Sequence, residues 1–403
     1  MIRISILGFY GYKNAGDEAI LSAMISALKT EIKDVDIVIF SIDPLYTTKI
    51  HNVRAVRQLY FGFLPLVSAV FKGMFFQIIK EIKSSNLLII GGGGLLSDWQ
   101  SSFVIFQWLW QAVVAKIFKK KVMIYAVGAG PIETKMGKFM TRCILNNCTN
   151  VITVRDNESK IWLQKAGVKR EIHVTADPAV LLRPVVSNRT IEILKGEKVD
   201  TNNYLIGISI WPMFLNMKYW PNQQTKFKKF KKLWPELINF VISKLNVGVV
   251  FIPMFLPRDK DFSLDLIKDV KNQDRVKVIN GSYNPQELMG IMGQMDMIIG
   301  MRCHTLILAA AMGVPLVGIV YQHKSDSFLR KINQIRFSVD IGDGISWEDK
   351  DINLEEITKN IESVWLKRQE LKREIITKTK DLKSKALLNA KMARLLLENK
   401  YFE

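Results

Sequence analysis

Cysteine and histidine are scarce in this chain, which contains three cysteines and four histidines among its 403 residues. Cys143, Cys148 and Cys303 do not show the paired spacing of a zinc ribbon, and they are too few for a framework of disulfide bonds. This usage fits a protein of a reducing compartment. Because no cluster of metal ligands is visible in the sequence either, we predict no metal and no cofactor.

Long uninterrupted apolar runs are also missing. A membrane-spanning helix needs about 20 predominantly apolar residues, and Pro65 and Lys72 interrupt the apolar residues 59–79. We expect this segment to lie at a membrane interface or in the protein core. The apolar run at residues 2–7 is too short for the core of a signal peptide and predicts a first strand, so we expect a cytoplasmic protein.

Acidic residues are few: 38 Asp and Glu stand against 57 Lys and Arg, which gives a formal net charge of +19. Such a surplus indicates an anionic partner. Since no nucleic-acid-binding motif is present, we predict no nucleic acid and favour an anionic membrane surface, with the protein peripheral at the inner face of the cell membrane. Aromatic residues interleaved with lysines at residues 219–234 support this expectation, and a solvated lysine-rich face is the alternative.

Short apolar runs of strand length, such as residues 151–154, alternate along most of the chain with helix-forming segments, such as residues 234–245 and 285–293. This is the pattern of parallel sheets connected by helices. A chain of 403 residues, 48% of them hydrophobic, has room for two domains with separate cores. We therefore predict an α/β fold of two Rossmann-like parallel-sheet domains facing a cleft. The expected segments are an N-terminal domain at residues 1–183, a linker at 184–203, a C-terminal domain at 204–345, and at 346–403 a long helical segment that packs back across the domains.

Most polar and glycine-rich motifs directly follow the predicted strands. Ligands of open parallel sheets bind at the carboxyl ends of the strands. In the first domain this rule brings the following residues to one edge of the sheet: Tyr10, Tyr12, Asp17, Gly91, Gly92, Gly93, Gly94, Arg155 and Asp177. In the second domain, Arg302 and His304 follow one predicted strand and Lys324 follows the next. Such side chains near helix starts, where backbone amides add positive charge, predict a site for a small anion.

Five of these residues also have a structural interpretation. Asp17 can be a favourable charge at a helix start, and Asp177 can be a turn residue before a proline. Arg155 can form an ion pair with a neighbouring carboxylate, and Arg302 can brace its own loop. An isolated histidine is usually structural, but the position of His304 beside an arginine at a strand end favours a functional role.

Five motifs occur in a fixed order along the chain. They are GFYGYKNAGDE at residues 8–18, GGGGLLSD at 91–98, TVRD at 153–156, Ala-Asp-Pro at 176–178, and GMRCH at 300–304 followed by GVPLVG at 313–318. Together they resemble the polysaccharide pyruvyl transferase family, most closely the bacterial enzymes that modify secondary cell-wall polymers. An ordered series of motifs is more specific than a single glycine loop.

The resemblance implies a glycosyltransferase-B-like fold and an enzyme with phosphoenolpyruvate as co-substrate. Such an enzyme places a pyruvate ketal across two hydroxyls of a sugar, in a polysaccharide or its lipid-linked precursor, and releases phosphate. The resemblance further implies that Arg155, His304 and Lys324 hold phosphoenolpyruvate, with Arg302 beside them. It also implies that Tyr10 and Tyr12 help to place the acceptor sugar.

Ketal formation requires a proton for the methylene carbon of the donor and a base for the sugar hydroxyls. Histidine ordinarily titrates near neutral pH, so we predict that His304 is the acid–base group, with Asp17 as the second choice. The run from Gly91 to Gly94 would let backbone amides approach a ligand closely.

Two other functions remain open at this stage. A nucleotide-sugar-dependent glycosyltransferase of the same two-domain architecture is the main alternative, because fold does not determine function. Such an enzyme commonly holds the ribose hydroxyls with a carboxylate, and residues 300–322 contain no Asp or Glu. A non-catalytic lipid- or nucleic-acid-binding protein would leave the predicted cluster of cationic residues without a purpose. The oligomeric state is open.

Overall fold

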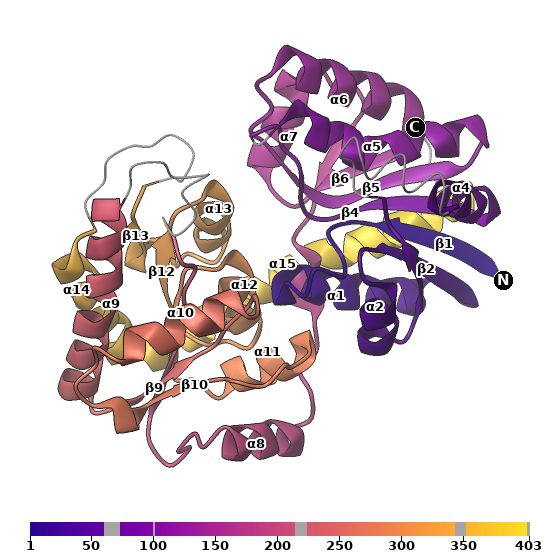
Figure 1. The fold of residues 1–403 in the computed structure, drawn as a ribbon. Coiled ribbons are helices and arrows are strands. Elements are labelled where there is room, and N and C mark those ends of the chain that lie inside the picture. Colours follow the sequence, from indigo (N-terminus) through magenta and orange to yellow (C-terminus); the bar gives the residue numbers. More distant parts are fainter. Residues whose placement is uncertain (60–72, 100, 214–223, 343–351, 401–403) are drawn as a thin grey trace. The chain divides into compact units, whose positions relative to one another are not determined.

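The computed structural model describes the chain except for residues 60–72, 100, 214–223, 343–351 and 401–403. The chain forms two compact units. Unit 1 consists of Met1–Leu182 together with Asp381–Glu403, and unit 2 consists of Arg183–Lys380. Each unit is built around one parallel sheet with helices on its faces (Figure 1), which confirms the predicted α/β class.

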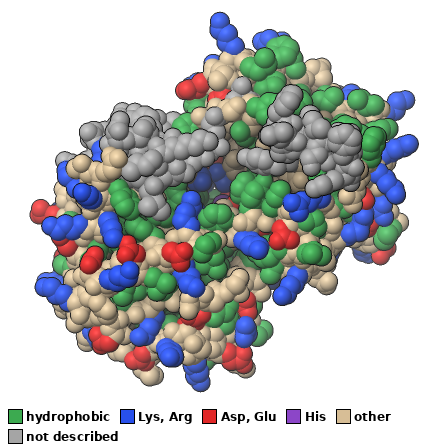
Figure 2. All heavy atoms as spheres, in the orientation of Figure 1, with side chains coloured by type: hydrophobic (Ala, Val, Ile, Leu, Met, Phe, Trp, Pro, Cys, Tyr) green, Lys and Arg blue, Asp and Glu red, His purple; other side chains and the backbone are tan. Residues whose placement is uncertain are grey.

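The surplus of basic residues is evident at the surface. Figure 2 shows Lys and Arg side chains spread over the face that it presents, with hydrophobic side chains among them. In the part of the chain that the structure describes, no helix is both long enough and apolar enough to cross a membrane.

The sheet of unit 1 has seven parallel strands in the order β3-β2-β1-β4-β5-β6-β7. The chain starts in the middle of the sheet, moves outward and returns to the middle with β4, so the loops after β1 and β4 leave the sheet side by side. Helices cover both faces of the sheet, so apolar residues predominate in its inner strands. The strands are β1 (Ile2–Leu7), β2 (Val35–Ser41), β3 (Arg54–Arg57), β4 (Leu87–Leu96), β5 (Lys121–Ala129), β6 (Val151–Val154) and β7 (Ile172–Val174).

Helices cover the two faces of this sheet in two groups (Figure 1). One face carries α4 (Met74–Ser84), α5 (Ser102–Ile117), α6 (Lys135–Cys148) and α7 (Asn157–Lys165). The other carries α1 (Ala15–Glu31), α2 (Pro44–His51) and the last part of α15 (Arg368–Leu397), with the short helix η1 (Pro178–Leu181) next to α1. Most of these helices begin at a polar residue whose side chain accepts a hydrogen bond from the first turn, as Asp156 does for α7.

The sheet of unit 2 has six parallel strands in the order β10-β9-β8-β11-β12-β13, so β8 and β11 lie at its middle. The strands are β8 (Leu205–Ser209), β9 (Gly248–Phe251), β10 (Val276–Val278), β11 (Met297–Gly300), β12 (Leu316–Val320) and β13 (Val339–Asp340). The helices are α8 (Ser187–Gly196), α9 (Gln224–Leu245), α10 (Arg258–Ile267), α11 (Pro285–Gly293), α12 (Cys303–Ala311), α13 (His323–Lys331), α14 (Leu354–Leu366) and the first part of α15; η2 (Gln273–Arg275) and η3 (Ile335–Phe337) are short 3₁₀ helices.

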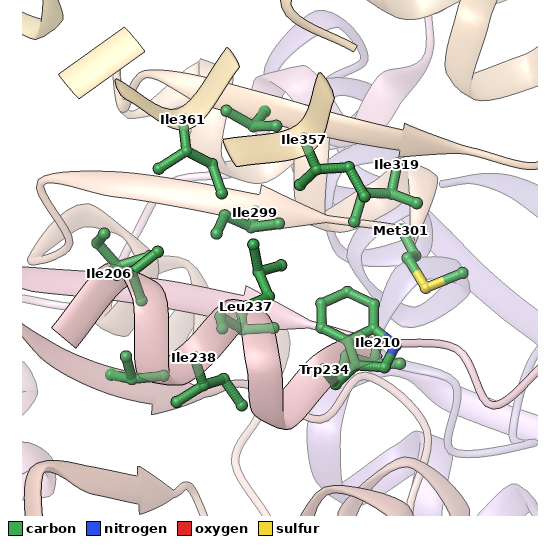
Figure 3. Packing of buried hydrophobic residues seen from close by; sticks show 14 of the residues in the cluster. Ile206, Ile210, Trp234, Leu237, Ile238, Ile299, Met301, Ile319, Ile357 and Ile361 are labelled. Atoms are coloured by element: carbon green, nitrogen blue, oxygen red, sulfur yellow. The ribbon is translucent and has the colours of Figure 1, made fainter. Parts of the chain in front are cut away.

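The core of unit 2 joins the sheet to α9 and α14. Trp234 and Leu237 lie one turn apart on α9, and Ile357 and Ile361 lie one turn apart on α14, the spacing that puts side chains on one face of a helix. All four side chains are fully buried and pack with Ile299 of β11 (Figure 3). Apolar residues at this spacing are the reason that these segments are helical and face the sheet.

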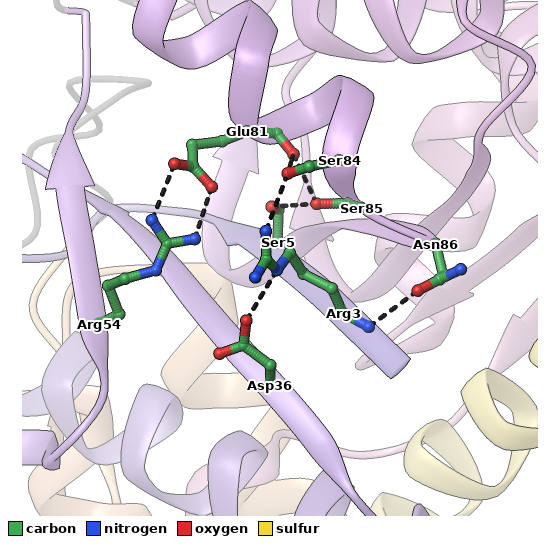
Figure 4. A network of polar contacts seen from close by, with 8 residues as sticks. All are labelled: Arg3, Ser5, Asp36, Arg54, Glu81, Ser84, Ser85 and Asn86. Carbon is green, nitrogen blue, oxygen red and sulfur yellow. Dashed lines mark hydrogen bonds and ion pairs between the residues drawn. The ribbon is translucent and has the colours of Figure 1, made fainter. Parts of the chain in front are cut away.

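A polar network joins α4 to the sheet of unit 1 (Figure 4). Arg54 of β3 donates two hydrogen bonds to the Glu81 carboxylate of α4, at 2.8 and 2.6 Å. The hydroxyl groups of Ser5 and Ser85 lie 2.6 Å apart, and Ser85 also donates to the Glu81 carbonyl oxygen. These bonds fix α4 against β1 and β3.

Several segments differ from the sequence-based expectations. Residues 184–203, the expected linker, contain α8, which packs on α11 and belongs to unit 2. The long C-terminal helix is confirmed, and α15 starts in unit 2 and ends in unit 1. The glycine run expected in a loop is part of β4. Two segments lie partly outside the described residues: 59–79, expected at a membrane interface or in the core, and 219–234, expected at a membrane surface.

Candidate active site

Tyr10 belongs to the core of unit 1. Its side chain is 0% exposed, and its hydroxyl donates to the Gly91 carbonyl oxygen at 2.5 Å. Burial raises the pKa of Tyr10 well above its ordinary value, and the Asp17 and Glu18 carboxylates act in the same direction, so the hydroxyl stays protonated. Tyr10 therefore braces the loop after β1 against β4. The predicted contact between Tyr10 and an acceptor sugar is corrected to this structural role, because the side chain has no exposed surface.

Tyr12 lies in the same loop and is half-buried. Its ring stacks on the ring of Phe9, with the centroids 3.8 Å apart and the planes 5° from parallel. Phe9 in turn meets Trp108 of α5 edge to face at 6.5 Å. Since the hydroxyl oxygen of Tyr12 is buried, the group that Tyr12 can offer a ligand is its ring.

Glu18 and His51 hold the backbone of this loop. One Glu18 carboxylate oxygen accepts from the Gly11 amide at 2.8 Å, and the other lies 2.6 Å from Nε2 of His51. The second ring nitrogen of His51 lies 3.0 Å from the Ser22 hydroxyl oxygen. Gly11 has a φ of 81°, in the left-handed region that glycine adopts readily. A fixed loop backbone at the middle of the sheet follows from these bonds.

Asp17 lies in the first turn of α1 and faces the glycine run. Its carboxylate accepts from the Asn14 side chain at 2.6 Å. A Cβ added to Gly93 would lie 2.9 Å from Oδ1 of Asp17, so glycine at this position lets the carboxylate approach β4. The favourable charge at a helix start, which was the structural interpretation of Asp17, is also present.

Arg155 follows β6 and is 7% exposed. Its Nη1 donates to the Asp177 carboxylate at 3.0 Å, and its Nε lies 3.6 Å from the Asp156 carboxylate. Asp177 also accepts from the Ala179 amide and so begins η1. The ion pair considered for Arg155 on the basis of sequence is therefore present, and it is buried, where removal of one partner is costly.

The guanidinium of Arg155 lies against glycines of two strands. A Cβ on Gly128 of β5 would stand 2.6 Å from Nη2 of Arg155, and a Cβ on Gly94 of β4 would stand 3.9 Å from the same atom. Asp17 approaches Gly93, the neighbouring glycine of β4. Asp17 and Arg155 thus border adjacent residues of one strand, in agreement with the expectation that they share one edge of the sheet.

Asn389, in the last part of α15, holds the strands that carry Arg155 and Asp177. It is 0% exposed, and its Oδ1 accepts from the hydroxyl groups of Thr153 at 2.6 Å and Thr175 at 3.0 Å. These threonines stand two residues before Arg155 and Asp177. A residue near the C-terminal end of the chain therefore fixes the ends of β6 and β7 from which both charged side chains extend.

In unit 2, Arg302 braces the start of α12. Its Nε donates to the Asp259 carboxylate at 3.0 Å and its Nη2 donates to the other oxygen of the same group. Asp259 is 1% exposed and also accepts from the amides of Met254 and Phe255. The loop-bracing interpretation of Arg302 is therefore supported by these bonds, and its predicted contact with the donor stays a prediction.

His304 and Lys324 lie at neighbouring helix starts. His304 is the second residue of α12 and Lys324 is the second residue of α13. The Cys303 sulfur lies 3.6 Å from the Lys324 carbonyl oxygen, which joins the two first turns. Neither N-cap residue, Arg302 or Gln322, makes a side-chain cap bond. Two adjacent helix starts with their positive ends together favour an anion.

Aromatic and hydroxyl side chains also lie at the carboxyl ends of the strands of unit 2. Trp211, after β8, stacks on Tyr321, after β12, with the centroids 4.5 Å apart. Burial raises the pKa of Tyr321 to about 12, so its hydroxyl stays neutral. The Thr305 hydroxyl donates to the Ser209 hydroxyl at 2.9 Å and fixes the start of α12 on β8.

Two supporting residues were missed from the sequence, Asp259 and Asn389. Asp259 stands 43 residues before its partner Arg302, and no local pattern links them. Asn389 carries a weak signal in the sequence. It lies on the same face of α15 as the buried residues Leu382, Ala386 and Ala393, which recur at helical spacing. A polar side chain on a buried face needs a hydrogen-bond partner within the protein.

The two doubly wound sheets, with polar residues after the strands at their middle, define a glycosyltransferase-B-like fold. The S. aureus MnaA–UDP co-structure is similar, with a TM-score of 0.65 and 10% identity over 100% of this chain and 98% of that chain. The E. coli ADP-heptose LPS heptosyltransferase II is similar with a TM-score of 0.51 and 13% identity over 92% of this chain and 100% of that chain.

The pattern of the polysaccharide pyruvyl transferase family matches residues 14–323, and the chain belongs to this family. A curated relative, the amylovoran biosynthesis protein AmsJ of Erwinia amylovora, is 22% identical over 379 residues, which are 84% of this chain and 88% of the relative. The protein is thus an enzyme of pyruvyl transfer to polysaccharide.

Proposed function

We propose that the enzyme transfers the pyruvyl group of phosphoenolpyruvate to two hydroxyls of one sugar, in a cell-surface polysaccharide or its lipid-linked precursor. The product is a pyruvate ketal, and phosphate is released. The observation that carries this proposal is that His304 and Lys324 lie in the first turns of two helices joined at their starts by the contact of Cys303 with the Lys324 carbonyl oxygen, and that neither N-cap side chain makes a cap bond. An arrangement of this kind suits a small, multiply charged anion.

The donor contacts that we propose are Arg155 of unit 1 and His304 and Lys324 of unit 2. Phosphoenolpyruvate carries a carboxylate and a phosphate, so its site needs several cationic groups. Arginine binds such groups through two parallel hydrogen bonds, whereas lysine acts as a point charge suited to phosphate. The pairing of Arg155 with Asp177 and Asp156 supports this role, because it holds the guanidinium in one orientation.

The chemistry needs two proton movements. The methylene carbon of the donor takes up a proton, and the first sugar hydroxyl attacks the adjacent carbon. Phosphate then leaves with its bridging oxygen, and the second hydroxyl attacks the same carbon. Of the two protons lost by the hydroxyls, one balances the new methyl group and the other leaves with phosphate. We assign the proton transfers to His304, with Asp17 as the alternative group.

The acceptor contact that we propose is the ring of Tyr12, which Phe9 holds flat at 3.8 Å. Aromatic rings offer an apolar face to the C–H groups of a sugar. The formal net charge of +19 supports a location at an anionic membrane surface, at the inner face of the cell membrane, where a lipid-linked acceptor would be found.

Acceptor-dependent release of phosphate tests the proposal. The purified protein is incubated with phosphoenolpyruvate and a panel of saccharides, and phosphate and ketal are measured, the latter by mass spectrometry. We expect phosphate and ketal in equal amounts with at least one saccharide. Turnover with UDP-sugars and none with phosphoenolpyruvate would refute the proposal and favour the nucleotide-sugar alternative.

Gly128→Ala is expected to raise KM for phosphoenolpyruvate about tenfold or more, because its Cβ would stand 2.6 Å from Nη2 of Arg155 and push the guanidinium aside. Gly128 does not have a positive φ, so its backbone accepts alanine. The control is Gly196→Ala at the end of α8, whose Cβ would meet nothing within 4 Å. Equal KM values for the two variants would show that the guanidinium does not contact the donor.

Asn389→Leu is expected to raise KM for phosphoenolpyruvate by about tenfold to a hundredfold, since the ends of β6 and β7 lose the acceptor that aligns them. Thr175→Val removes one of the two hydroxyls and is expected to act in the same direction. Steady-state kinetics and thermal unfolding are measured together.

The matched control for Thr175→Val is Thr149→Val. Thr149 is an equally buried threonine of unit 1 whose hydroxyl donates to the Leu145 carbonyl oxygen. We expect the control to lower the unfolding temperature without changing KM. If KM follows the unfolding temperature in all three variants, Asn389 has only a general structural role.

A further inference from the structure

The helical layer α4–α6 of unit 1 exposes large apolar side chains on the side away from the sheet. Its inward residues are buried in the core, for example Ile82, Leu109 and Leu145. Its outward residues include Phe76, which is 64% exposed, and Ile117, which is 69% exposed. The exposed large apolar residues of the three helices, which we call the α4–α6 surface, are Phe76, Phe103, Val113, Ile117, Met136 and Phe139.

The charged residues of these three helices are nearly all basic. The basic ones are Lys80, Lys83, Lys116, Lys135, Lys138 and Arg142. The acidic one is Glu81, which is 7% exposed and is bonded at both oxygens by Arg54. The α4–α6 surface therefore combines exposed apolar side chains with an excess of positive charge that the described residues of these helices do not neutralise.

The basic and apolar groups lie close together. Lys83 Nζ lies 5.7 Å from the ring centroid of Phe118, and the Arg142 guanidinium lies 5.5 Å from the ring centroid of Phe139. Long basic side chains can keep their charge in a headgroup layer while their stems and the neighbouring rings enter the apolar layer below.

We propose that the α4–α6 surface docks on a bilayer of anionic phospholipid. An acidic polysaccharide would use the lysines but would leave the exposed Phe and Ile side chains in water. A protein partner with an apolar face would use the rings but not the uniform positive charge. A bilayer with anionic headgroups uses both. The inference rests on the membrane location proposed above and adds the surface that makes the contact.

Co-sedimentation of the full chain with vesicles tests this inference. The vesicles contain equal parts of phosphatidylglycerol and phosphatidylcholine, or phosphatidylcholine alone. We expect binding to the anionic vesicles, weakened by salt, and little binding to the neutral ones. Absence of binding to anionic vesicles would overturn both the surface and the membrane location, whereas turnover of phosphoenolpyruvate, measured separately, would be unaffected.

Two triple variants separate the roles of charge and apolar groups. One replaces Lys80, Lys116 and Lys135 with glutamine, one lysine from each helix, and is expected to weaken binding about a hundredfold, because each lysine near an anionic leaflet contributes about a factor of five. The other replaces Phe76, Ile117 and Phe139 with serine and is expected to weaken binding at least tenfold. Retained binding in the second variant would contradict docking of the apolar groups and favour a purely electrostatic partner.

The matched control replaces three exposed lysines of unit 1 in or next to α1 and α2, which cover the other face of the same sheet: Lys29, Lys33 and Lys49 become glutamine. It removes the same net charge from a different part of the protein. We expect its affinity for anionic vesicles to stay within about twofold of the wild type, since exposed charges beyond a Debye length of about 10 Å are screened. If the control weakens binding as much as the variant of the α4–α6 surface, the attraction is diffuse and the proposed surface is wrong.

Discussion

Arg155→Lys is expected to lower kcat/KM for phosphoenolpyruvate about a hundredfold or more while the protein stays folded. Lysine keeps the positive charge that the buried Asp177 and Asp156 carboxylates need. It lacks the planar fork that binds a carboxylate or phosphate through two parallel hydrogen bonds. A preorganised hydrogen-bond donor in an active site typically contributes a factor of about 100 to 1,000 to kcat. Steady-state kinetics with varied phosphoenolpyruvate measures the effect.

Lysine is a sharper test than alanine at this position. Arg155→Ala would leave two buried carboxylates without a partner, at an expected cost of about 3–5 kcal/mol in stability, so loss of activity could follow from unfolding. Arg54→Lys is the matched control, because Arg54 also binds a carboxylate of unit 1 through two hydrogen bonds. We expect this control to keep kcat/KM within about twofold. If Arg155→Lys also keeps kcat/KM within about twofold of the wild type, Arg155 does not bind the donor.

Elements with local signals could be predicted from the sequence. The helix expected at residues 285–293 is α11, because Pro285 suits its first turn and Asn284 and Glu287 form a capping box. The strand expected at residues 151–154 is β6, whose four apolar residues are all buried. In such segments the sequence pattern and the tertiary environment favour the same structure.

Elements whose local signal was weak or misleading could not be predicted from the sequence. α9 begins at Gln224 and not near residue 234, because Pro235, typical of a helix start, lies inside this helix. β3 was missed since its sequence, Arg54 to Arg57, has two arginines around two small apolar residues, which only an edge strand tolerates. The glycine run joins β4 because its backbone pairs with β5, a contact that composition does not reveal.

The edge at which the site residues lie followed from topology, but their individual contacts did not. Parallel strands bring the residues after them to one edge, and Asp17 and Arg155 do border neighbouring glycines of β4. Whether a side chain at that edge faces a ligand or the interior depends on partners distant in sequence. The Tyr10 hydroxyl donates to the Gly91 carbonyl oxygen, and the Arg302 guanidinium donates to the Asp259 carboxylate. Neither bond could be predicted from the sequence.

His304→Gln is expected to lower kcat about a hundredfold to ten-thousandfold, the range that general acid–base catalysis contributes, with a smaller change in KM for phosphoenolpyruvate. Glutamine keeps a hydrogen-bond donor at the start of α12 but does not take up and release protons near neutral pH. His323→Gln is the matched control, because His323 is exposed at the start of the neighbouring helix α13. We expect the control to keep its kcat.

Asp17→Asn decides between the two acid–base candidates. Asparagine keeps an oxygen that can accept from the Asn14 side chain, so the first turn of α1 should be retained while the titrating group is lost. If His304 moves the proton, the pH profile of kcat keeps its shape in Asp17→Asn and loses one limb in His304→Gln. The reverse pattern would assign the proton transfer to Asp17 and leave His304 with charge and hydrogen bonding alone. Because Asp17→Asn is isosteric and His304→Gln keeps a hydrogen-bond donor, a change in the shape of the profile reports the proton transfer and not a change of fold.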